Sequence, residues 1–245
     1  MIVRVGTSGY DYAEWTGTFY PRDLPAARRL DHYARHFTTV EINATFYRMP
    51  TPAMLAGWAA RTPAGFTFAL KAPQRITHFA RLRDVGDPVR FLCDAALALG
   101  PRLGPLLFQL PPAFRKDTGR LADLLALLPA GLRVAFEFRH DSWLDDDVYE
   151  RLRTRNAALC IADSGDRTTP LVATADVGYL RLRDQGYGEG DLARWADRIL
   201  DLGAGWREAF VFFKHEASGT GPAFARRLVE LLERRAPAVT RPASA

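Results

Sequence analysis

The stretch Arg133-Val134-Ala135-Phe136-Glu137-Phe138-Arg139-His140-Asp141-Ser142-Trp143 predicts a β-strand that ends in a loop. Successive strand side chains point to opposite faces. One face is apolar and carries Val134, Phe136 and Phe138, and the other carries Ala135, Glu137 and Arg139. A carboxylate and a guanidinium at the end of a buried strand need each other or a ligand. We therefore expect chemistry at the carboxyl end of this strand.

The same plan recurs along the chain. Besides the stretch above, strands are predicted at 2–5, 38–43, 66–71, 106–110, 158–162, 179–183 and 209–213. Helices are predicted at 24–37, 51–60, 87–99, 118–128, 145–155, 191–202 and 222–235, with Thr51 and Thr118 as N-caps. Eight strands alternating with helices, without a Pro/Gly/Ser linker, predict a single (β/α)8 TIM barrel of the α/β class.

This barrel is expected to span residues 1–235 as one domain. The Pro- and Ala-rich tail, 236–245, is expected to be disordered. A doubly wound open sheet is the rival architecture, and it usually opens with a G-x-G-x-x-G phosphate loop. The loop Gly6-Thr7-Ser8-Gly9 lacks that spacing, which favours the barrel.

Composition points to an ordinary globular protein. Of the 245 residues, 48% are hydrophobic and 25% are charged. No apolar run is long enough to cross a membrane, and Met1 to Gly6 lacks the apolar core of a signal peptide. We therefore expect a cytoplasmic protein without a membrane partner. Cys93 and Cys160 are far apart in apolar surroundings, and are expected to be reduced, buried thiols.

The net charge of +5 is compatible with a nucleic-acid partner. However, no basic run is longer than two residues, and no obvious surface platform interleaves Arg with aromatics. Nucleic-acid binding without turnover is therefore kept as an alternative. The aromatic loops at 10–20 and 46–47 are expected to form a lid over the barrel mouth or to stack on a base or sugar.

Polar residues mark the carboxyl ends of seven predicted strands, on the face away from the apolar helices. They are Glu41, Asn43, Lys71, Gln109, Glu137, Arg139, Asp163, Arg181, Arg183 and Lys214. In a barrel this face points inward or to the mouth, where active sites of the fold lie. Each of them, taken alone, is better explained by a surface charge or an internal ion pair. Their recurrence favours a shared site, to which the small loop residues Thr7 and Ser8 are added as backbone-approach positions.

The charges of these residues constrain the ligand. Three carboxylates share the mouth with five cations, and Arg suits bidentate capture of phosphate or carboxylate. The sequence therefore predicts a small or nucleotide-like anionic substrate, with Lys71, Arg139 and Arg181 as anion clamps. The catalytic candidates are Glu41, Glu137, His140 and Asp163. Burial raises a carboxyl pKa and an adjacent Arg lowers it, so an acid/base role for Glu137 or Glu41 stays open.

Hydrolase or isomerase-like chemistry is the favoured activity, because no nucleotide-cofactor fingerprint is present and no cofactor is expected. His78 lies in the loop after the third strand and is a binding candidate. The carboxylates with His78, His140 and His215 form a possible metal-ligand set. No H-x-H or H-E-x-x-H spacing is present, and the interleaved cations oppose a divalent ion. No metal is expected, although a metal-dependent nuclease stays an alternative.

Six ordered motifs resemble one known family. They are Gly6-Thr7-Ser8-Gly9-Tyr10, Trp15-x-Gly17-x-Phe19-Tyr20-Pro21, Val40-Glu41-Ile42-Asn43-x-Thr45-Phe46-Tyr47, Phe68-x-x-Lys71-Ala72-Pro73 with Ile76-Thr77-His78, Phe108-Gln109-Leu110-Pro111-Pro112, and Glu137-x-Arg139-His140-x-Ser142-Trp143. The chain resembles the domain of unknown function 72 family, the YecE-like proteins, over nearly its whole length. The resemblance implies a TIM barrel and no established reaction.

Two family motifs differ in this chain. Where the resemblance leads us to expect Arg-x-His-Gly, the seventh strand ends in Arg181-Leu182-Arg183-Asp184. Where it leads us to expect Phe-Asn-Asn, the eighth ends in Phe213-Lys214-His215-Glu216. Both changes add positive charge at the expected mouth, so no ligand or metal role is carried over to these two strands.

Overall fold

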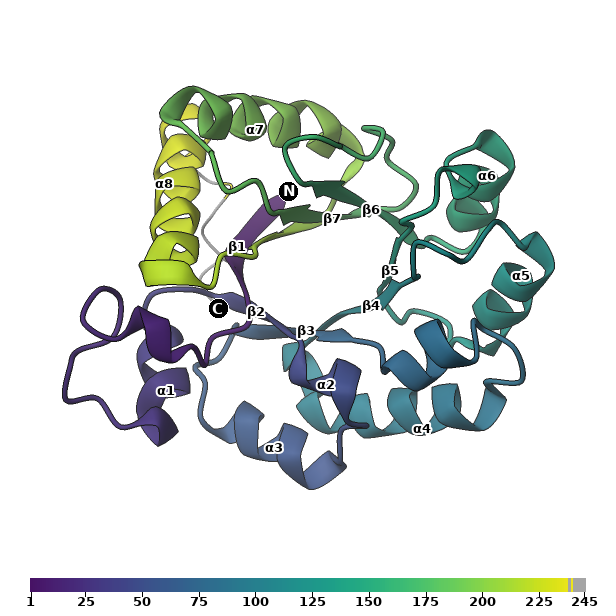
Figure 1. The fold of residues 1–245 in the computed structure, drawn as a ribbon, viewed down its shortest axis with the longest axis horizontal. Coiled ribbons are helices and arrows are strands. Elements are labelled where there is room, and N and C mark those ends of the chain that lie inside the picture. The colour runs from purple at the N-terminus through teal and green to yellow at the C-terminus, as the bar shows by residue number, and fades with distance from the viewer. Residues whose placement is uncertain (238, 240–245) are drawn as a thin grey trace.

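The computed structural model describes residues 1–237 and 239, and it is a closed barrel of eight parallel strands ringed by helices (Figure 1). Each strand pairs with the next, and β1 pairs with β8. The strands are β1 Ile2–Ser8, β2 Thr39–Ile42, β3 Thr67–Lys71, β4 Leu103–Gln109, β5 Val134–Glu137, β6 Ala158–Asp163, β7 Val177–Leu182 and β8 Glu208–Phe213. The predicted (β/α)8 barrel is confirmed.

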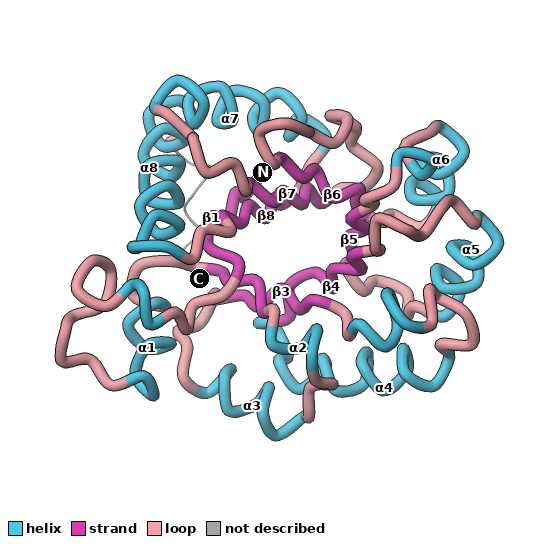
Figure 2. Tube along the Cα trace, in the orientation of Figure 1, coloured by secondary structure: helices cyan, strands magenta, loops and turns pink. Residues whose placement is uncertain are grey.

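The helices lie outside the strands (Figure 2). They are α1 Arg29–Tyr33, α2 Ala44–Tyr47, α3 Pro52–Ala60, α4 Gly86–Ala96, α5 Thr118–Leu127, α6 Asp146–Thr154, α7 Glu189–Leu202 and α8 Thr220–Arg235. The first helix is shorter than predicted, because a separate 3-10 turn at Ala26–Arg28 ends in the non-helical Arg28. The expected loop at 72–83 contains a π-helical turn at Arg75–Phe79. None of the described helices combines the length and apolarity that a bilayer crossing requires.

Side-chain caps explain several helix starts. Thr51 accepts a hydrogen bond from the Met54 N–H at 3.3 Å, as predicted. The predicted cap at Thr118 is wrong, since Asp117 accepts the Arg120 N–H at 3.0 Å. Thr118 is the first helical residue, and a side chain caps best from the residue before the helix.

The strands separate two layers of apolar side chains. Val134, Phe136 and Phe138 pack in the outer layer beneath the helices, as the alternation in the opening stretch predicted. A smaller inner cluster fills the barrel below the mouth and consists of Ala69, Leu107, Ala135, Ala158, Cys160, Val177, Tyr179, Phe210 and Phe212. The mouth therefore has a solid apolar floor.

The two cysteines are free and buried, as expected. Burial raises the pKa of Cys93 to about 11 and that of Cys160 well above its usual value. Neither thiol forms a reactive thiolate at neutral pH.

The aromatic loop before α1 belongs to the outer layer. Trp15, Phe19 and Tyr20 are buried, and the Phe19 ring lies against Tyr33 of α1 with a centroid distance of 6.1 Å. Most of the tail expected to be disordered, namely residues 238 and 240–245, lies outside the described residues. Within the described part, the Val239 carbonyl accepts the Val3 N–H at 2.6 Å.

Candidate functional site

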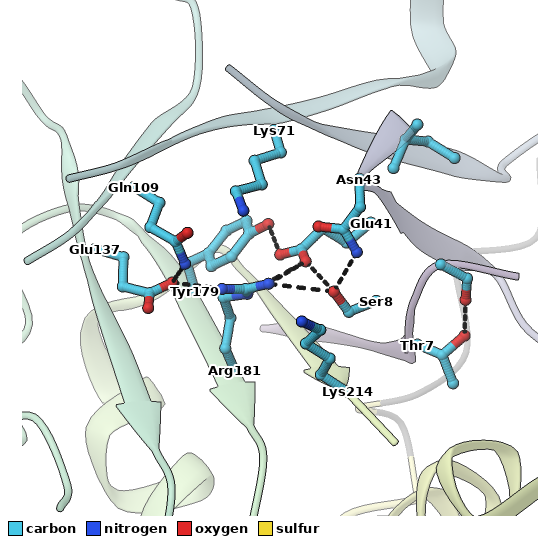
Figure 3. Close-up of polar contacts among 12 residues, drawn as sticks. Thr7, Ser8, Glu41, Asn43, Lys71, Gln109, Glu137, Tyr179, Arg181 and Lys214 are labelled. Atoms are coloured by element: carbon cyan, nitrogen blue, oxygen red, sulfur yellow. Dashed lines mark hydrogen bonds and ion pairs between the residues drawn. The ribbon is translucent and has the colours of Figure 1, made fainter. Parts of the chain in front are cut away.

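A buried ion-pair network centred on Arg181 of β7 lies above the apolar floor (Figure 3). Arg181 Nη1 donates to Glu137 Oε2 at 2.6 Å, and Nη2 donates to Glu41 Oε1 at 2.8 Å. All three side chains are 1% exposed or less. Charges removed from water need close partners, so the network holds both carboxylates in place across the barrel interior.

Glu137 receives two further donors. Gln109 Nε2 donates to its Oε2 at 2.7 Å, and Arg139 Nε donates to its Oε1 at 3.1 Å. Burial alone raises the pKa of Glu137, but the attraction of Arg181 and then of Arg139 outweighs burial, so this pKa lies well below its usual value. Glu137 is therefore a fixed carboxylate at neutral pH and a poor proton donor.

A small side chain on β6 lets Arg181 reach Glu137. Ala162 pairs in register with Arg181, and Gln109 pairs in register with Glu137. Because β6 contributes only a methyl group at this level, the guanidinium extends past it to β5. The period-two pattern of the strands thus places the three charges at one depth in the barrel.

Glu41 also accepts hydrogen bonds from two hydroxyl groups, one on each carboxylate oxygen. Tyr179 donates its hydroxyl to Glu41 Oε2 at 2.7 Å, and Ser8 donates to Oε1. Asn43 Nδ2 in turn donates to Ser8 Oγ at 2.8 Å. The sequence analysis missed Tyr179, although it lies two residues before Arg181 and must share its inward face.

Lys71 ends β3 at the edge of the network and is 9% exposed. Its Nζ lies 3.9 Å from the centroid of the Phe46 ring, and no carboxylate of the described residues lies within ion-pair distance of it. Burial, followed by repulsion from Arg181, lowers the pKa of Lys71 to about 8. At pH 7 about a tenth of Lys71 is therefore free amine, far more than for an ordinary lysine.

His78 lies beside this lysine. Its ring meets Phe46 edge-on, with centroids 4.9 Å apart, and its Nδ1 lies 2.9 Å from Thr77 Oγ1. Burial and then the nearby Lys71 charge lower the pKa of His78. The sequence analysis expected Phe46 in an aromatic loop that covers the mouth or stacks on a ligand, and it did not foresee the contact of this ring with Lys71.

A second group of cations lies at the ends of β7 and β8. Arg183 and Lys214 line one pocket of about 490 Å³ together with Ser164, Gln185, Glu216 and Ala217. Figure 3 shows Lys71 and Lys214 approaching Arg181 from opposite sides. The two positions where the sequence departs from the family motifs therefore share a wall of the mouth.

Asp163 does not join this site, and the inward placement predicted for it is wrong. The inward residues of β6 include Ala158 and Cys160, so alternation directs Asp163 to the outer face. There it accepts hydrogen bonds from Tyr187 at 2.6 Å and Trp195 at 3.2 Å.

Thr7 and His140 also point elsewhere. Thr7 lies on the outer face of β1, where its hydroxyl and N–H contact the Tyr33 hydroxyl at 2.9 and 2.8 Å. Figure 3 shows it apart from the network. His140 accepts the Ser142 N–H on Nδ1 at 3.1 Å and so caps a short 3-10 turn. Within the described residues, no group of three or more His, Cys, Asp or Glu side chains is placed to hold a metal ion.

An apolar cavity adjoins Phe46. It measures about 630 Å³, and its lining includes Phe46, Tyr47, Phe79 and Phe91. Tyr47 and Phe79 are among the most exposed large apolar side chains described. This aromatic groove extends the site beyond the charged network.

Comparison with known proteins matches residues 4–245 to the family described as protein of unknown function DUF72. UPF0759 protein YecE of Escherichia coli is 37% identical over 127 residues, 51% of this chain and 47% of that protein, so the match spans about half of its length. UPF0759 protein YunF of Bacillus subtilis is 23% identical, with 95% of each chain covered. The crystal structure of a DUF72 family protein from Thermotoga maritima is 25% identical, has a TM-score of 0.82, and covers 95% of this chain and 100% of that one.

Proposed function

The chain belongs to the DUF72 family of proteins of unknown function, and we propose that it is an enzyme acting on a small anionic substrate at the mouth of its barrel. In this proposal Lys71 is the group that transfers protons. The supporting observation is a buried lysine without a carboxylate partner in the described part of the chain, next to an arginine that two carboxylates already neutralise.

The charge balance at the mouth supports an anionic ligand. The inward carboxylates are Glu41 and Glu137. With Asp163 turned outward, they face the five cations Lys71, Arg139, Arg181, Arg183 and Lys214. A site with excess positive charge and limited water favours carboxylates and phosphates.

The two glutamates are better suited to positioning than to proton transfer. Glu41 and Glu137 hold Arg181 in one orientation with bonds of 2.8 and 2.6 Å, and the lowered pKa of Glu137 keeps it ionised. A general base works best when its pKa lies near the working pH, and the pKa of about 8 brings Lys71 close to that condition. Proton removal next to a carbonyl, as in an isomerisation, or activation of water in a hydrolysis, fits this group.

The first experiment measures the titration of Lys71 directly. The chain contains only three lysines, Lys71, Lys116 and Lys214, so reductive ¹³C-methylation gives few signals. Lys71→Arg and Lys116→Arg assign them. We expect the Lys71 signal to move with a midpoint near pH 8, and the proposal fails if that midpoint lies near the ordinary lysine value.

The second experiment tests turnover. Carboxylated and phosphorylated metabolites are screened for stabilisation of the protein, and those that bind are followed by NMR for conversion. We expect Lys71→Met to abolish conversion and Arg207→Gln, at the exposed amino end of the barrel, to leave it unchanged. Conversion at an equal rate in Lys71→Met, or the lack of any stabilising anion, would remove the proposal.

A further inference from the structure

The pocket between the loops after β6, β7 and β8 is built from residues that the charged network does not use. It measures about 490 Å³ and is lined by Ser164, Arg183, Gln185, Lys214, Glu216 and Ala217. Arg183 and Lys214 continue the inward alternation of Arg181 and Phe212 by two residues, so both side chains point to the mouth. The pocket thus opens on the same space as the proposed substrate site.

Backbone hydrogen bonds fix the main chain that carries both cations. The Arg183 N–H donates to the Asp163 carbonyl at 2.8 Å, and the Lys214 N–H donates to the Leu182 carbonyl at 3.1 Å. These bonds extend the strand ladders of β6, β7 and β8 beyond the last strand residues. The main chain of the pocket is therefore preformed, which lowers the ordering cost of binding.

Two buried side chains clamp the surrounding loops. His215 Nε2 lies 2.6 Å from the Asp184 carbonyl, which ties the loop after β8 to the loop after β7. Trp15 Nε1 donates to the Glu216 carbonyl at 3.0 Å. Both rings are at most 2% exposed, so the walls that carry Arg183 and Lys214 are held from outside the pocket.

The cations lack counter-charges of the kind found elsewhere in the barrel. Arg183 Nε is buried without a hydrogen-bond partner, and no described carboxylate forms an ion pair with this guanidinium. Among the described carboxylates, Lys214 pairs only with Glu216, at 4.0 Å, and the side chain of Glu216 is 56% exposed. Burial and the nearby Arg181 lower the pKa of Lys214, and Arg183 adds to this repulsion. An anion between Arg183 and Lys214 would relieve it.

We propose that this pocket binds a phosphate group, held by the guanidinium of Arg183 and the ammonium of Lys214. A planar two-pronged donor together with a compact point charge suits a tetrahedral dianion better than a single carboxylate. The loops after strands seven and eight are a frequent phosphate-binding position in barrels of this kind. The inference rests on the proposed function and narrows its substrate class to small phosphate monoesters, whose remaining part extends past Arg181 towards Lys71.

The test is binding of inorganic phosphate and glycerol phosphate to the full chain by calorimetry, with glycerol and acetate as comparison ligands. We expect both phosphates to bind, and Arg183→Gln and Lys214→Met each to weaken binding by about tenfold or more. The matched controls are Arg207→Gln, at the amino end of the barrel, and Lys116→Met, whose ammonium pairs with Asp145, and neither residue lines the pocket. They should change phosphate binding less than about threefold. Unfolding in urea checks that each variant is folded.

Three results would overturn the pocket assignment. They are lack of phosphate binding by the wild type, unchanged binding in Arg183→Gln and Lys214→Met, and an equal loss in the controls. If binding is lost in Lys71→Met but kept in Arg183→Gln and Lys214→Met, phosphate binds elsewhere in the mouth. The pocket inference then fails while the anionic-substrate proposal stands. If binding follows Arg183 but Lys71 titrates as an ordinary lysine, the acid–base proposal fails and the phosphate site stands.

Discussion

Arg181 Nη1 lies 2.6 Å from Glu137 Oε2, although the whole of β6 separates the two strands that carry them. The same guanidinium reaches Glu41 on β2. One side chain therefore links three strands across the barrel interior, at the depth where the apolar floor ends. A ligand bound above this floor would therefore meet an arginine whose orientation Glu41 and Glu137 already fix.

Arg181→Met should destabilise the fold strongly. Removing the cation leaves Glu41 and Glu137 buried without their main counter-charge, and breaking a buried pair from one side costs about 3–5 kcal/mol. The free energy of unfolding from urea titrations measures the change. Arg207→Met removes an exposed arginine and should stay within about 0.5 kcal/mol of the wild type. Equal stability of the two variants would show that the network contributes little.

Glu137→Gln should change how stability depends on acid. The pKa of Glu137 is lowered in the folded chain, so the unfolded chain binds this proton at higher pH and acid favours unfolding. The stability from this carboxylate is present above its ordinary pKa of 4.5 and is lost as the pH falls below it. The free energy of unfolding of Glu137→Gln should therefore lie below that of the wild type at neutral pH, and this difference should shrink below pH 4.5. Urea unfolding at a series of pH values measures it, with the exposed Asp123→Asn as control. A deficit that is constant with pH contradicts the assignment.

The barrel itself was predictable because its signal repeats. Each strand carries an apolar outer face, as with Val134, Phe136 and Phe138, and each strand except β6 is followed by a helix before the next strand begins. Errors fell at element ends, as at Thr118, where one residue decides which side chain caps the helix.

The site was predictable only in part. Alternation assigns residues to the inner or outer face only when the sequence shows which positions of the strand are the apolar outer ones. Glu41, Lys71, Glu137 and Arg181 were placed correctly from the apolar faces of their strands. In β6 nearly every residue is apolar, so the sequence gives no phase, and Asp163 was assigned to the wrong face. The pairing of Arg181 with Glu137 depends on the small Ala162 beside it, which only the strand register reveals.

Asp163→Asn should weaken the fold and leave the mouth unchanged. Oδ2 of the carboxylate accepts hydrogen bonds from Tyr187 and Trp195 beneath α7, and Oδ1 accepts one from Thr168 at 2.7 Å. An amide has only one acceptor oxygen, so it cannot accept on both sides. We expect a loss of about 1–3 kcal/mol in the free energy of unfolding. The pH midpoint of Lys71 should not move, because Asp163 is not among the groups that set its pKa. The titration midpoint of Lys71 is measured in the ¹³C-methylated protein. A shift of this midpoint in Asp163→Asn would show that Asp163 acts on the site at the mouth.

Lys71→Met should make the protein more stable at neutral pH, although it removes the group proposed to transfer protons. The pKa of Lys71 is lowered to about 8 from 10.5, so holding its charge in the folded chain costs free energy below pH 8. That cost is at most about 3 kcal/mol, and loss of the contact with Phe46 offsets part of it. The variant should therefore gain about 1–3 kcal/mol at pH 7.

The pH dependence distinguishes this gain from better packing by methionine. Between pH 8 and 10.5 the unfolded chain holds the Lys71 proton and the folded chain does not, so the wild type becomes relatively more stable as the pH rises. The advantage of Lys71→Met should therefore shrink across this window. Urea unfolding from pH 7 to 10 measures it, with Lys116→Met as the matched control. An advantage that stays constant with pH would mean that Lys71 carries no strained charge, and the case for a functional amine at the mouth would lose its energetic basis.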